Sequence, residues 1–198
     1  MASALIKAIR TVSGNQPEIR RLPEEAAQTF LDGTPVQINN VDGGVQAWDG
    51  VTIPQGIAGV SKESASNLAV TGTVPSMFGA GAIGAVSTVG VVSAKNVQNQ
   101  PLARTIYRGS PYNDTRVGFE VAVSDTVFYG QVGPNQTPVP SDVSKLYGLT
   151  KDTDGHWYVD RTKTGNSAVL TIVKLDPIDV LRGVHFQFNQ AAQQLSPA

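Results

Sequence analysis

An all-β fold, either a small β-barrel or a sandwich, is what this sequence of 198 residues predicts. Between residues 29 and 68, short apolar runs alternate with Asp-Gly and Gly-Gly pairs, which is the punctuation of small β-hairpins. Further along, Val117, Phe119, Val121 and Val123 occupy every second position, so a strand would carry all four on one face. A chain of this length can bury a substantial core as one domain without disulfides.

The first 28 residues lack the turn pattern and are expected to form an extended N-terminal arm. Lys7, Arg10, Arg20 and Arg21 make the segment basic. We expect these four cations to bind a partner, with residues 1–22 packing on a neighbouring protein instead of completing their own core.

Residues 29–198 form the predicted β-rich body, with a Gly/Ala/Val-rich insertion at about residues 69–115. No Asp or Glu occurs from Ser64 through Asn113. Two interpretations remain open for this stretch: a flexible, partly buried insertion, or a surface that meets another subunit. In the second, Arg104 and Arg108 would bind acidic groups of that partner.

The remaining elements follow in order. The run Val127–Val132 is expected to pair with the preceding strand across Ser124-Asp125-Thr126, and residues 133–140 form a proline-rich loop. A turn at 151–155 leads into a strand at 156–160, and residues 184–188 alternate again. The predicted core includes Phe119, Val121, Trp157, Leu170, Ile172, Phe186 and Phe188.

Composition narrows the classes of partner. The formal net charge is −1, so bulk charge predicts neither a nucleic acid nor a membrane partner. Charged residues make up 16% of the chain, against about 25% in average soluble domains, so neutral side chains must cover much of the surface. The absence of cysteine excludes thiolate chemistry and suits a reducing cytoplasm.

The motifs that carry reaction chemistry are missing, so no enzymatic activity, catalytic residue or cofactor is expected. Residues 79–84 match Gly-x-Gly-x-x-Gly, but Pro75 interrupts any preceding strand and the Val-rich run that follows favours strand over helix. His156 and His185 have no nucleophile or base motif around them, and His185 is expected to be solvated on the polar face of its strand.

Asp152-Thr153-Asp154-Gly155 resembles the start of a calcium loop, but no glutamate stands at the twelfth position. A hairpin turn is the better interpretation, and no metal site is predicted. Asp160 could still approach this turn and allow weak calcium binding.

Two stretches carry a resemblance to a known family. The first has Phe30-x-x-Gly-x-Pro-Val, then Trp48-Asp49-Gly50, then Gly56-Ile-Ala-Gly-Val and a small-residue segment ending in Asn67; the second is 146–188. Both resemble head decoration (capsid cement) proteins of tailed bacteriophages. The resemblance implies extended chain around Pro23-Glu24-Glu25, where the residues alone would equally permit a helix start.

This resemblance implies a structural virion protein, made in the host cytoplasm, that binds the outer surface of the phage head. Its partner would be the major capsid protein, whose subunit contacts it would stabilise, and its expected assembly is a homotrimer. The alternative is a tail or baseplate component, or a carbohydrate-binding β module that uses Trp48 or Trp157–Tyr158 at an exposed edge.

Overall fold

The computed structural model describes residues 6–25, 28–41, 43–51, 56–67 and 116–195. Within these ranges the chain forms strands and three short 3-10 helices but no α-helix, and every strand pair is antiparallel. The predicted all-β fold is therefore confirmed, as a sandwich and not as a closed barrel.

The strands are β1 Lys7–Thr11, β2 Ile19–Pro23, β3 Gln28–Phe30, β4 Pro35–Ile38, β5 Val45–Ala47, β6 Gly59–Ser61, β7 Ala65–Asn67, β8 Arg116–Val121, β9 Thr126–Gln131, β10 Leu146–Lys151, β11 Trp157–Asp160, β12 Leu170–Leu175 and β13 Gly183–Phe188. The 3-10 helices are η2 Pro140–Asp142, η3 Gly165–Ser167 and η4 Gln190–Ala192.

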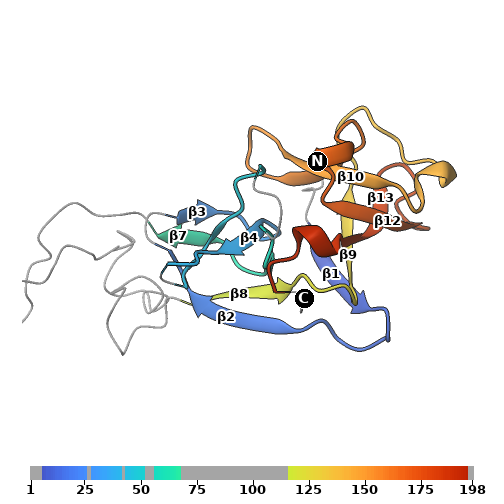
Figure 1. Ribbon diagram of the computed structural model, residues 1–198. Coiled ribbons are helices and arrows are strands. Elements are labelled where there is room, and N and C mark those ends of the chain that lie inside the picture. Colours follow the sequence, from blue (N-terminus) through green and yellow to red (C-terminus); the bar gives the residue numbers. More distant parts are fainter. Residues whose placement is uncertain (1–5, 26–27, 42, 52–55, 68–115, 196–198) are drawn as a thin grey trace, which may run out of the picture.

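Two larger sheets and a two-stranded ribbon organise these strands. One sheet has six strands in the order β1-β9-β13-β12-β10-β11, the other has five in the order β2-β8-β6-β4-β5, and β3 pairs with β7. Figure 1 shows β10, β12 and β13 of the first sheet on the right and β2, β4 and β8 of the second on the left.

The main core lies between the two larger sheets. The rings of Phe128, Phe186 and Phe188 pack against one another with centroids 5.0–5.9 Å apart, and the indoles of Trp48 and Trp157 lie 5.3 Å apart. Aromatic pairs at these separations add to the stabilisation that burial alone gives. Every residue of the predicted core is buried: Phe119, Val121, Trp157, Leu170, Ile172, Phe186 and Phe188.

A second core covers the other face of the five-stranded sheet. Val117, Phe119 and Val121 of β8 pack there with Phe30 of β3 and Ala65 of β7. The alternation seen in the sequence is therefore real: Val117, Phe119 and Val121 face the second core, whereas Gly118 between them lies near the charged side chains of Arg21 and Glu63.

The chain changes sheet between β8 and β9, which corrects the predicted hairpin across residues 124–126. β8 pairs with β2 and β6, whereas β9 pairs with β1 and β13. The turn at Asp125 is held by β1's end: Val12 donates its N–H to the Asp125 carbonyl at 2.7 Å, and Ser13 binds the Asp125 carboxylate at 3.0 Å. Turn chemistry locates a change of direction but does not say which sheet the next strand joins.

The prediction that residues 1–22 pack outside their own core is wrong for residues 6–22. β1 forms one edge of the six-stranded sheet, β2 forms one edge of the five-stranded sheet, and the Ile6 side chain is 1% exposed. By pairing with β9 and β8, these strands form backbone hydrogen bonds that their N–H and C=O groups would otherwise make with water or a partner. Glu24 continues in extended form, bridging to Val45, so of the two alternatives left open at Pro23-Glu24-Glu25 the chain takes the extended one.

The proposed insertion at about 69–115, with Arg104, Arg108 and the glycines of 79–84, lies outside the described residues. The predicted turn at 151–155 is confirmed as the connection between β10 and β11, in which Gly155 donates its N–H to the Asp152 carbonyl.

Candidate interaction surface

The connection between β12 and β13, residues 176–182, presents three aliphatic side chains to solvent. Ile178 is 91% exposed, Val180 63% and Leu181 67%. Scattered apolar residues are ordinary on a protein surface, but several gathered on one short loop are typical of a contact site. We call residues 176–182 the apolar loop.

Asp176 fixes the start of the apolar loop. Its Oδ1 accepts the N–H groups of Ile178 at 2.7 Å and Asp179 at 2.9 Å, and its Oδ2 lies 2.9 Å from Nε2 of His185. The Asp179 N–H and then the His185 side chain lower the pKa of Asp176, so the carboxylate stays ionised.

Asp179 ties the middle of the same loop to the neighbouring strand β9. Its Oδ2 accepts hydrogen bonds from the Tyr129 hydroxyl at 3.2 Å and the Gln131 amide at 2.8 Å. Gly183 closes the loop so tightly that an added Cβ would stand 2.7 Å from Cβ of Asp176. The loop is thus held in one shape by its own polar residues, which leaves its aliphatic ones free for contact.

His185 is part of this support and is not solvated as the sequence predicted. Its side chain is 15% exposed, and its ring lies edge-on to Tyr129 with centroids 6.3 Å apart. Strand alternation placed His185 on the polar face correctly, but the apolar loop folds back over that face.

Four of the six predicted partner-binding cations lie in the described residues, and they are distributed over two sheets. Lys7 lies over the Tyr129 ring at 5.7 Å and Arg10 is exposed on the same strand. Arg20 pairs with Glu18 at 2.7 Å, and Arg21 pairs with Glu63 at 3.1 Å, on the other sheet. The last two cations, Arg104 and Arg108, are outside the described residues.

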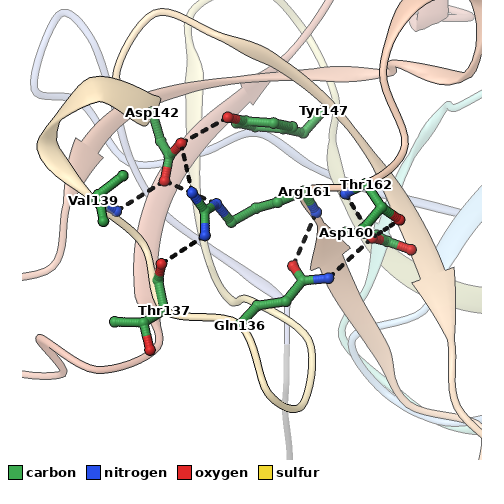
Figure 2. A network of polar contacts seen from close by, with 8 residues as sticks. All are labelled: Gln136, Thr137, Val139, Asp142, Tyr147, Asp160, Arg161 and Thr162. Carbon is green, nitrogen blue, oxygen red and sulfur yellow. Dashed lines mark hydrogen bonds and ion pairs between the residues drawn. The ribbon is translucent and has the colours of Figure 1, made fainter.

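A second polar group, which the sequence analysis missed, pins the proline-rich loop to β11 (Figure 2). Asp142 is buried and accepts hydrogen bonds from the Val139 N–H at 2.8 Å, the Tyr147 hydroxyl at 2.7 Å and Arg161 Nη2 at 3.0 Å. Arg161 also donates to the Thr137 carbonyl at 2.7 Å. We call Asp142, Tyr147 and Arg161 the buried clamp.

The buried clamp has a structural role, because the charged groups of Asp142 and Arg161 bind each other and backbone groups of the loop. Burial alone would raise the pKa of Asp142, but the N–H of Val139, the Tyr147 hydroxyl and the Arg161 guanidinium together lower it. Its members are spread over the 20 residues from 142 through 161 and form no motif. From the sequence, only the need to anchor a long loop could have indicated such a cluster.

The lowered pKa of Asp160, which precedes Arg161 of the clamp, makes the free energy of unfolding depend on pH. Burial disfavours its charge, but the Thr162 hydroxyl and N–H, the Thr150 hydroxyl and the Gln136 amide lower its pKa to about 2. A lowered folded pKa means that the stabilisation is complete above the unfolded value of about 3.9 and is lost as the pH falls towards 2.

We therefore expect Asp160→Asn to lower the free energy of unfolding by about 2 kcal/mol at neutral pH. The difference from wild type should shrink between about pH 4 and pH 2, since wild-type Asp160 is being protonated there. Urea unfolding at a series of pH values measures it, and a constant difference down to pH 2 would show that the charge is not what stabilises.

The tryptophans that the carbohydrate-binding alternative would use are not at an exposed edge. Trp48 is 3% and Trp157 5% exposed, because both indoles lie in the main core. Of the aromatic residues that this interpretation would use, Tyr158 alone is partly exposed.

Comparison of the chain with protein-family models, with curated proteins and with solved structures finds no match. In the described part of the chain, no helix has the length and apolar character needed to cross a membrane. Any functional assignment therefore has to come from the residues and geometry above.

Proposed function

We propose that this chain is a head decoration protein, which binds the outer surface of an assembled phage capsid and stabilises contacts between major capsid subunits. The observation that carries the proposal is the apolar loop: three exposed aliphatic side chains on a segment that the body holds in one shape. The resemblance of residues 29–68 and 146–188 to decoration proteins supplies the identity of the partner.

Weak contact sites combine their affinities when several of them bind one lattice at once. A loop that is already ordered loses little conformational entropy on binding, so more of its contact energy becomes affinity. A homotrimer at local threefold positions of the head would present three such loops, and simultaneous engagement multiplies their individual affinities. The low proportion of charged residues fits a protein whose surface contacts are mainly neutral.

The experiment incubates the purified chain with expanded, empty heads and, separately, with tail assemblies, and then measures which particle it sediments with. We expect binding to heads that survives roughly 0.5 M salt, because exposed charge pairs are strongly screened there and apolar contacts are not. Sedimentation with tails alone would instead assign the chain to the tail or baseplate.

The triple change Ile178→Ser, Val180→Ser and Leu181→Ser is expected to abolish head binding. Each side chain that becomes buried in the contact contributes about 1.5 kcal/mol or more, which is at least about tenfold in affinity per residue. Because the three side chains are exposed in the free chain, the variant should fold normally, which circular dichroism checks.

A matched control is the double change Val41→Ser and Val51→Ser. These valines are 93% and 80% exposed but lie in the loops before and after β5, which belongs to the other sheet. They should leave head binding unchanged. If the control variant weakens binding as much as the loop variant does, general surface hydrophobicity and not the apolar loop makes the contact.

A further inference from the structure

The hairpin turn between β10 and β11 gathers two carboxylates and an imidazole. Asp152, Asp154 and His156 each offer a donor atom, and these atoms lie within 4.8 Å of one another. Across the described ranges, no other group of three such side chains comes together in this way. The decoration function proposed above makes no use of the cluster.

The backbone of the turn holds the carboxylate of Asp152 in place. Asp152 Oδ1 accepts the N–H groups of Asp154 at 3.0 Å and His156 at 2.7 Å, and the Asp152 N–H binds the His156 carbonyl at 2.9 Å. Gly155 takes a φ of +93°, a conformation that glycine adopts without strain. One carboxylate oxygen is thereby used to build the turn, and the other is directed towards the imidazole.

The distance between this second oxygen and the imidazole is informative. Oδ2 of Asp152 lies 3.5 Å from Nδ1 of His156, which is long for a hydrogen bond. Two ligands on one tetrahedral ion, with bonds of about 2.0–2.2 Å, stand about 3.4 Å apart. The pair is therefore already spaced as two ligands of a small metal ion would be.

We propose that this turn binds a first-row divalent metal ion of the zinc class. The ligands are Oδ2 of Asp152, a carboxylate oxygen of Asp154 and Nδ1 of His156, and water completes the coordination. The imidazole nitrogen decides the class of ion, since nitrogen together with oxygen suits zinc and its neighbours whereas calcium and magnesium prefer oxygen alone.

Of the other charged residues of this hairpin, Asp160 lies away from the site and Lys151 lies next to it. Asp160, which the sequence analysis placed near this turn, pairs opposite Gly148 at the other end of the hairpin and is not a ligand. Lys151 lies beside the turn, with its Cε 3.7 Å from where a Cβ on Gly155 would stand. An ammonium there opposes cation binding, so removing it should strengthen the site.

The test is calorimetric titration of the full chain with Zn²⁺ alone, near neutral pH in a buffer that does not bind metals. Background binding is low, because the chain has no cysteine and only two histidines, of which His185 is engaged with Asp176. We expect one Zn²⁺ per chain, with weaker binding of Ca²⁺.

His156→Ala and Asp154→Asn should each weaken Zn²⁺ binding at least as much as losing a residue that only hydrogen-bonds to a metal ligand does, about 10–100-fold. Lys151→Gln should tighten it, and Glu18→Gln, which removes an exposed acid next to β2 in the other sheet, should leave it unchanged. Asp152→Asn keeps an oxygen for the turn's backbone bonds while weakening metal binding, so it separates loss of the ligand from loss of the fold.

Three results would overturn the proposal. They are the absence of saturable Zn²⁺ binding to the folded wild-type chain, wild-type affinity in His156→Ala, and tighter binding of Ca²⁺ than of Zn²⁺. None of them bears on capsid binding, which the sedimentation experiment measures separately.

Discussion

Gly59→Ala is expected to lower the free energy of unfolding by about 3 kcal/mol or more, at the upper end of what overpacking costs. Gly59 lies in β6 between β4 and β8. A Cβ there would stand 2.2 Å from the Glu120 carbonyl oxygen and 2.6 Å from Cδ2 of Phe119. Neither group can move aside without a large cost in free energy, since one is backbone of the paired strand β8 and the other is the buried ring of Phe119.

Gly118→Ala is the matched control, because Gly118 lies in the adjacent strand β8. The nearest atom to its added Cβ is Oε1 of Glu63, at 3.6 Å, which is ordinary contact. This change should alter stability by less than about 1 kcal/mol. Urea unfolding of both variants measures the difference, and equal stabilities would mean that β6 and β8 are not packed as closely as described.

Arg161→Met is expected to destabilise the protein by about 3–5 kcal/mol, the range for breaking a buried ion pair from one side. The Asp142 side chain is 1% exposed, so losing Arg161 leaves a buried carboxylate without its cation. The Thr137 carbonyl loses its donor as well, which frees the proline-rich loop.

Arg20→Met provides the comparison for an exposed ion pair. Arg20 and Glu18 are 45% and 53% exposed, so water and salt screen their attraction and the change should cost less than about 1 kcal/mol. Thermal unfolding at low and high salt measures both variants. If Arg161→Met were as mild as Arg20→Met, the buried clamp would contribute nothing beyond an ordinary surface pair.

The fold class could be predicted because period-two alternation and turn residues are local properties of the sequence. Val117, Phe119 and Val121 alternate as expected, and all are buried. The assignment of strands to sheets could not be predicted, because it depends on contacts between distant residues: β8 and β9 are consecutive but belong to different sheets. The same limit explains the N-terminal segment, whose basic residues concealed two edge strands.

The candidate site was less accessible to sequence reasoning than the fold. Ile178, Val180 and Leu181 are apolar residues close to a strand, and nothing in the local sequence distinguishes them from buried ones. The loop that exposes them is held to the sheet by the contacts of Asp176 with His185 and of Asp179 with Gln131. The cations were chosen by composition, and the structure distributes the described ones over two sheets. The motif Asp152-Thr153-Asp154-Gly155 was visible, but the contribution of His156 required the geometry of the hairpin.

The central claim is that this chain covers the outside of a phage head through the apolar loop. An electron cryomicroscopy reconstruction of expanded heads, incubated with the purified protein, tests it most directly. We expect added density on the outer surface at local threefold positions, into which the β-sandwich fits with residues 176–182 against the major capsid protein. Heads without added density, or density that places this loop away from the capsid, would contradict it.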